Sequence, residues 1–115
     1  LLTCVSGLTL DWLRYLPKDE FQGLVLEALG MGNVPPDILP VLGELAEERI
    51  PIVITSRCRR GFVEPTYAYE GGGKDLERLG VIFAKGLSGP KARLKLMIAL
   101  EMTKNIEELK HIFSG

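Results

Sequence analysis

The chain has 115 residues, of which 46% are apolar and 25% are charged, and its formal net charge is −1. This length suits one domain with a single core, and the composition is that of a soluble globular protein. The near-neutral charge gives no electrostatic reason to expect nucleic acid or an anionic membrane as a partner, and no apolar run approaches the ~20 residues that a membrane span needs.

The sequence begins in an expected strand, residues 1–5, without a methionine or a charged leader. This apolar stretch is too short for the core of a signal peptide. We therefore expect a fragment of a longer protein. Cys4 and Cys58 are too far apart in sequence for a CxxC redox or zinc pattern. We expect them to be free, buried thiols in a reducing compartment, the cytoplasm.

The next two elements are a helix and a strand. Residues 9–16 have loosely helical apolar spacing, with Ser6 or Thr9 as a possible cap and Pro17 at the end. Residues 23–29 form the second expected strand, which is apolar except for Glu27. Such a run is typical of a strand that is covered on both faces in a parallel sheet.

A glycine-rich turn follows this strand, with Gly30 and Gly32 spaced one residue apart and Asn33 after them. Glycine allows positive φ or a close approach of the backbone to a ligand. Open α/β sheets bind ligands at the carboxyl ends of their strands, so Asn33 is a candidate site residue. The alternative is that Asn33 is a turn residue that tolerates left-handed φ.

A helix is expected to follow and to end near Arg49. Pro36 could be its first residue, since proline's missing N–H is not needed there. Asp37 fits better as its N-cap, because Pro40 then falls among the first-turn positions whose N–H groups have no intrahelical partner. The buried stripe of this helix is expected to consist of Ile38, Leu39, Leu42, Leu45 and Ala46. The third strand, residues 51–55, is a β-branched run after a proline.

The segment after the third strand has no regular pattern. Its basic turn, residues 56–61, could bind an anion through Arg57, Arg59 and Arg60, or could be a solvated surface loop. Residues 62–70 are irregular and carry two tyrosines and Glu70, which could reach a neighbouring site or pack locally. The triple glycine, residues 71–73, is expected to be a flexible elbow.

The last part of the chain has clear helix signals. A short helix over residues 75–79 ends at Gly80, and the fourth strand covers residues 81–84. Ser88 caps a helix over residues 89–102, and Asn105 caps a final helix over residues 106–113.

Strands that alternate with helices imply right-handed crossovers and a parallel sheet. We therefore expect a three-layer α/β domain with a four-stranded parallel sheet and helices on both faces. Such a domain is doubly wound, flavodoxin-like or Rossmann-like.

The helix over residues 89–102 is apolar on nearly every side. A helix of this kind is usually buried on more than one face. In so short a chain, its second face is expected to meet another domain or subunit. The alternative is an unusually apolar core helix in a monomer.

Catalytic machinery is not evident in the residues themselves. His111 is the only histidine, and it lies on a charged helix without a neighbouring serine or cysteine, which favours a solvated, structural role. The sequence contains no HExxH motif, no carboxylate cluster with metal-ligand spacing and no Walker-type phosphate loop. We expect no metal.

Three motifs in order resemble the C-terminal domain of bacterial L-asparaginases: VLEALGMGNVPP, PIVITSRCRRGFVEPTYAY and LGVIFAKGLSGPKARLKLMIAL. The resemblance covers residues 23–113 and extends to glutaminase-asparaginases and to an amidotransferase subunit of archaeal glutaminyl-tRNA synthesis. It implies hydrolysis of L-asparagine to L-aspartate and ammonia, without a metal or organic cofactor. It also implies that the threonine nucleophile and a Thr-Asp-Lys set lie in a larger N-terminal domain, so that this chain carries no catalytic residue.

The resemblance further implies partners and a site residue. The domain would pack against its own N-terminal domain and across a homodimer or homotetramer, and would lend an asparagine to the active site of the neighbouring subunit. That asparagine matches Asn33, with Gly32 beside it as a substrate-binding neighbour. A glutamate that some members supply aligns near Gly73, and Glu70 is a displaced substitute to which the role is not transferred. A stand-alone α/β binding or assembly module, and the amidotransferase subunit, are the alternatives.

Overall fold

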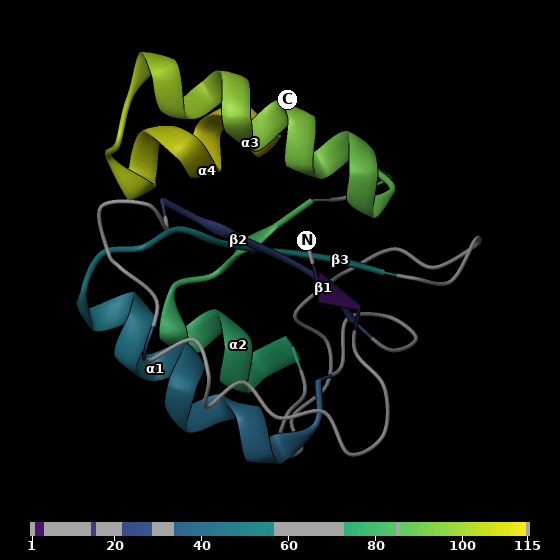
Figure 1. The fold of residues 1–115 in the computed structure, drawn as a ribbon, viewed down its shortest axis with the longest axis vertical. Helices are drawn as coiled ribbons and strands as arrows, with labels where there is room; N and C mark the ends of the chain where they lie inside the picture. The colour runs from purple at the N-terminus through teal and green to yellow at the C-terminus, as the bar shows by residue number, and fades with distance from the viewer. Residues whose placement is uncertain are drawn as a thin grey trace.

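The domain consists of three layers with a parallel β-sheet in the middle (Figure 1). The computed structural model describes residues 2–3, 15, 22–28, 34–56, 73–84 and 86–114. Its sheet has four strands in the order β1-β2-β3-β4, and all neighbouring pairs are parallel. The strands are β1 (Leu2–Thr3), β2 (Leu24–Ala28), β3 (Ile52–Ser56) and β4 (Ile82–Phe83). The expected α/β architecture with a parallel sheet is confirmed.

Two pairs of helices cover the two faces of the sheet (Figure 1). Alternate side chains of each strand point to opposite faces, so Leu26 and Ile54 join one core while Val25 and Val53 join the other. The helices on the first face are α1 (Leu39–Glu47) and α2 (Gly73–Leu79), and those on the second are α3 (Gly89–Met102) and α4 (Ile106–Ser114).

The strand order corrects the expectation of a doubly wound sheet. A flavodoxin-like order is 2-1-3-4-5, with a reversal of direction, whereas the strands here follow one another without a reversal. The connections β2–α1–β3 and β3–α2–β4 place both helices on one face. The second face is covered by α3 and α4, which follow the last strand instead of connecting strands.

The start of α1 differs from the expected capped helix. Pro36–Ile38 form a 3₁₀ turn, in which the Ile38 N–H donates to the Pro35 carbonyl at 3.1 Å. Asp37 therefore lies inside this turn, and its predicted N-cap role is wrong, since the α-helix begins only at Leu39 and Ile38 precedes it. Pro40 does occupy the first turn of the helix, as predicted. The predicted apolar stripe of α1 is buried or half-buried against the sheet.

Helices α1 and α2 end in the same way. At the end of α1, the N–H of Ile50 donates to the Leu45 carbonyl and that of Arg49 to the Ala46 carbonyl, both at 3.0 Å. These two bonds define a Schellman motif with Arg49 at φ 61°, a conformation that favours glycine. Gly80, at φ 84°, ends α2 through the equivalent pair of bonds, as its sequence position predicts.

The predicted caps of α3 and α4 are confirmed. The Ser88 hydroxyl accepts from the Lys91 N–H at 3.4 Å, and Asn105 Oδ1 accepts from the Glu108 N–H at 3.1 Å. The bounds of α3 equal those expected from the sequence. Helix α2, by contrast, begins at Gly73, so the third glycine of the expected elbow is helical.

Several predictions concern residues outside the described ranges. They are the helix over residues 9–16 apart from Tyr15, both cysteines, the basic turn with Arg57, Arg59 and Arg60, and the loop with Glu70. Within the described ranges, each helix is too short or too polar to span a bilayer.

Candidate functional site

The carboxyl edge of the sheet is the place from which the glycine-rich turn leaves β2. Asn33 and Gly32 lie outside the described residues, which stop at Ala28 and resume at Val34. Both of these flanking residues are buried in the core of the α1 and α2 face. The five-residue connection therefore starts and ends at fixed points of the core, and Ala28 lies opposite Ser56 at the end of β3.

Glu27 is the charged residue of β2 that lies nearest this edge. It lies on the face of the sheet that α3 covers, and its side chain packs against Gly89, the first residue of that helix. A Cβ built on Gly89 would lie 2.6 Å from Glu27 Cδ. The amino end of a helix carries unpaired N–H groups and a partial positive charge, so it is a favourable place for a carboxylate.

Thr55 is the register partner of Glu27 on the neighbouring strand. It is fully buried, and its hydroxyl donates a hydrogen bond to the backbone carbonyl of Leu87. The two polar side chains thus fix the segment from Leu87 to Gly89 to the ends of two adjacent strands. The amino end of α3 is held at the same sheet edge from which the glycine-rich turn departs.

Neither residue is a candidate site residue from the sequence. The one available signal is that Glu27 interrupts an otherwise apolar strand. A carboxylate inside a central strand needs a polar or positively polarised neighbour, because burial without one is costly. Thr55 gave no such signal, since threonine is common in strands on propensity alone.

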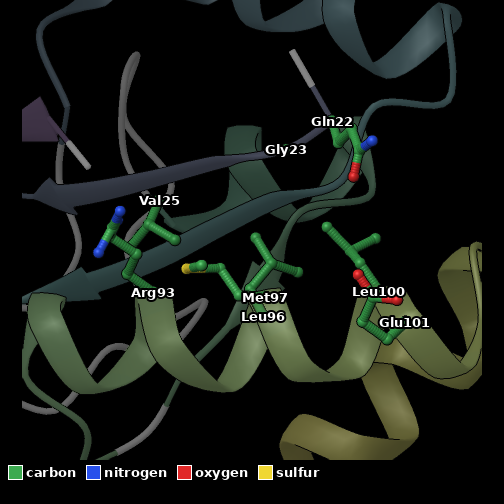
Figure 2. A pocket seen from close by; sticks show the side chains of 8 residues that line it. All are labelled: Gln22, Gly23, Val25, Arg93, Leu96, Met97, Leu100 and Glu101. Carbon is green, nitrogen blue, oxygen red and sulfur yellow. The ribbon is translucent and has the colours of Figure 1, made fainter. Parts of the chain in front are cut away.

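A groove opens between α3 and the beginning of β2, at the opposite edge of the sheet (Figure 2). Its volume is about 370 Å³. The strand side of the groove consists of Gln22, Gly23 and Val25, and the helix side of Arg93, Leu96, Met97, Leu100 and Glu101. Figure 2 shows these helix side chains rising toward the strand, with Arg93 near one end and Glu101 near the other.

The described residues contain no nucleophile that is paired with a base. His111 is exposed, and its backbone carbonyl accepts from the Ser114 hydroxyl at 2.7 Å, a contact within the last turn of α4. Of the three basic residues that alternate along α3, Lys95 lies over the Phe113 ring at 5.1 Å, while Lys91 and Arg93 are exposed. Among the described residues, no group of three or more histidine, cysteine or acidic side chains could hold a metal ion.

Known proteins are similar to this chain in sequence and in fold. Residues 1–113 match a family model described as the glutaminase/asparaginase C-terminal domain. A probable L-asparaginase from Deinococcus radiodurans is 38% identical over 96 residues, which are 84% of this chain and 29% of that protein. A glutamyl-tRNA(Gln) amidotransferase subunit from Pyrococcus abyssi is 32% identical over 110 residues, 96% of this chain and 25% of that protein.

The solved structure of a thermostable L-asparaginase from Thermococcus kodakarensis superposes with a TM-score of 0.79 at 31% identity, covering 97% of this chain and 35% of that one. The chain thus spans less than a third of the length of the two curated relatives. The family match covers nearly all of its residues. The chain belongs to the glutaminase/asparaginase family, as a C-terminal domain of that family.

Proposed function

We propose that this chain is the C-terminal domain of an enzyme that hydrolyses L-asparagine to L-aspartate and ammonia. In this proposal the threonine nucleophile lies in a larger N-terminal domain, and the isolated chain is inactive. The family match over residues 1–113 carries the proposal, and the similarity to L-asparaginases agrees with it.

The proposed contribution of this domain to the site is Asn33, with the backbone of Gly32 beside it. An amide side chain both donates and accepts hydrogen bonds, so it can hold the polar groups of a substrate and orient them. The position of the turn supports this role. It leaves β2 at the carboxyl edge of a parallel sheet, and both of its ends are buried.

The first experiment measures ammonia release by the full-length protein and by this chain alone, with L-asparagine or L-glutamine as substrate. We expect turnover of L-asparagine by the full-length protein and none by the isolated chain. Turnover at an enzyme-like rate by the 115 residues alone would contradict the assignment of the nucleophile to another domain.

Two variants of Asn33 separate substrate binding from a turn role. Asn33→Ala is expected to lower kcat/KM severalfold without loss of folding. Asn33→Gly is the matched control, because glycine keeps the backbone freedom of a turn residue but has no amide. If the amide contacts substrate, both variants lose activity. If Asn33 serves only the turn, the glycine variant keeps full activity.

A second candidate is a glutamyl-tRNA(Gln) amidotransferase, which the similarity to the Pyrococcus abyssi protein favours. In that case, ammonia release by the full-length protein would depend on added glutamyl-tRNA(Gln). Hydrolysis of free L-asparagine at the same rate with and without the tRNA would eliminate this candidate.

A further inference from the structure

The beginning of β2 is paired on one side and open on the other. β3 pairs with all five residues of β2, whereas β1, as far as the structure describes it, pairs with Leu26 and Glu27 alone. Within the described part of the chain, the first residues of β2 therefore have no strand beside them at this border, where the groove of Figure 2 begins. Such a border is a template for a further strand.

The direction of the backbone N–H groups shows which residues face this border. The Leu24 N–H donates to the Pro51 carbonyl at 3.0 Å, so it points toward β3. N–H groups alternate in direction along a strand, and those of Gly23 and Val25 therefore point toward the β1 side. Val25 is only 3% exposed, and a buried N–H group needs a hydrogen-bond acceptor.

The register of β1 and β2 identifies a segment that supplies these acceptors. Leu2 lies opposite Leu26. When both strands are followed backwards, the second residue before Leu1 comes to lie opposite Gly23. In a parallel ladder, an N–H group donates to the carbonyl of the residue that precedes its register partner. The Val25 N–H therefore meets the carbonyl of the residue immediately before Leu1, and the Gly23 N–H meets a carbonyl two residues further back.

The groove offers this segment an apolar surface on the α3 side. A Cβ on Gly23 would face α3, at 3.0 Å from Leu96 Cδ2 and 3.6 Å from Leu100 Cδ1. Register partners point to the same face of a sheet, so the side chain opposite Gly23 also faces these two leucines. The groove, of about 370 Å³, has room for that side chain. Large side chains on a neighbouring strand are known to cover glycines at the edge of a sheet.

We propose that the segment immediately before Leu1 continues β1 backwards along β2 in the full-length protein and fills this groove. The second residue before Leu1 is apolar, and its side chain packs on Gly23, Leu96 and Leu100. The inference rests on the proposed function, under which a larger N-terminal domain precedes Leu1. It adds that the connection enters this domain as a strand of the sheet and not as a free linker.

Continuity favours this segment over a strand from another molecule. The chain that precedes Leu1 has to leave β1 at this border, so a foreign strand would compete with it for the same space. The register is already set by Leu2 and Leu26, and a strand of the same chain does not lose the translational and rotational freedom that association costs. The connection to the N-terminal domain is thereby hydrogen-bonded to β2, the strand from which the glycine-rich turn departs.

Amide hydrogen exchange in the full-length protein, read at single residues, tests the strand. Leu24 is the internal reference, because its bond to Pro51 is present without the extension. We expect protection factors for Gly23 and Val25 within about tenfold of that for Leu24, since all three then belong to one hydrogen-bonded sheet. Weaker protection of Gly23 and Val25 than this would overturn the proposal.

Thiol labelling tests the occupation of the groove. Leu100→Cys places a thiol in its lining, and changing the second residue before Leu1 to glycine should speed the labelling of this thiol by about tenfold or more. The same change at the residue immediately before Leu1, whose side chain faces the other side of the sheet, is the matched control and should have no such effect. Peptide mapping separates the new thiol from Cys4 and Cys58.

Ile98→Cys is a second control, because residue 98 is 64% exposed on the outer side of α3 and should be labelled at one rate in every background. An unchanged labelling rate for Leu100→Cys would overturn the assignment of the groove. The exchange measurement needs no substitution, so it decides the strand whether or not the glycine variant folds.

Neither measurement requires turnover. Protected Gly23 and Val25 amides in a full-length protein that releases no ammonia from L-asparagine would leave the extension in place and remove the proposed function. An active protein in which these two amides are unprotected would remove the extension alone. The two proposals therefore fail separately.

Discussion

The side chain of Glu27 fills the space beside Gly89 in which any other residue would place its own side chain. Glu27 Oε2 lies 2.8 Å, and Cγ 2.7 Å, from the position of a Cβ on residue 89. Glycine at the first position of α3 therefore leaves room for a carboxylate 62 positions earlier in the chain.

This contact predicts the effect of Gly89→Ala. The new methyl group must displace Glu27 from the amino end of α3, so the variant is expected to lose about 1–3 kcal/mol of unfolding free energy in urea. The control is Gly43→Ala in α1, where the new Cβ would lie 3.7 Å from Leu79 Cδ2, an ordinary contact. Helix propensity should make this control more stable by about 0.5–1 kcal/mol.

A double-mutant cycle assigns the loss to Glu27. Glu27→Ala removes the side chain with which the new methyl group collides, so Gly89→Ala should cost much less in that background than in the wild type. Equal costs in the two backgrounds would show that the contact with Glu27 is not the cause.

Thr55→Val is predicted to destabilise the domain although valine has nearly the same shape. The substitution removes the buried hydroxyl that bonds to Leu87 and leaves the half-buried carbonyl of that residue without this partner. We expect a loss of about 1–3 kcal/mol in the free energy of unfolding. Thr103→Val is the surface comparison, because its hydroxyl accepts from the exposed Asn105 N–H at 3.1 Å, and it should cost about 0.5 kcal/mol or less.

The end of α1 offers a stabilising substitution. Arg49 has φ 61°, at the position of the Schellman motif that Gly80 occupies at the end of α2. Arg49→Gly removes the steric cost of the left-handed conformation, which is about 1–2 kcal/mol for a residue with a Cβ. The greater freedom of glycine in the unfolded chain offsets part of this gain. The melting temperature should therefore rise by a few degrees.

Glu48→Gly is the control for this prediction. Its φ of −81° and ψ of 4° are accessible to every residue, so glycine relieves no backbone strain there and brings an entropic cost. The melting temperature of this variant should fall. A fall for Arg49→Gly as well would contradict the strain argument.

The two helix caps are predicted to differ in strength. Asn105→Ala removes a 3.1 Å bond at the start of α4 and should cost about 1 kcal/mol. Ser88→Ala removes a bond of 3.4 Å, close to the limit for a hydrogen bond, and should cost less. Thermal unfolding of the two variants side by side tests the order, and a larger loss for Ser88→Ala would reverse it.

Local signals in the sequence predicted most element types and several boundaries. The bounds of α3 follow from Ser88 and Pro90, which act within one turn of the helix. β2 was found to within a residue at each end, because its apolar run is bounded by polar and glycine residues. Gly80 also marks the end of α2 by a local effect, because glycine readily adopts the positive φ that ends a helix.

Features that depend on distant residues could not be obtained in this way. The strand order, the contact between Glu27 and Gly89, and the bond from Thr55 to Leu87 join segments that are 24 to 62 residues apart. Periodicity carries no information about which of these segments meet. Arg49 shows that even a local feature can be missed in the sequence. The two Schellman hydrogen bonds hold this arginine at positive φ, and arginine as a residue type does not indicate that conformation. Asn33 stays a prediction that rests on its position after β2.

The strand order has a consequence for solubility. β4 stands at one border of the sheet and is only two residues long, Ile82–Phe83. A long, flat edge strand allows another chain to add to the sheet through backbone hydrogen bonds and to start aggregation. A short edge strand offers too few free backbone groups for this. At that border, contact between copies through backbone hydrogen bonds is disfavoured.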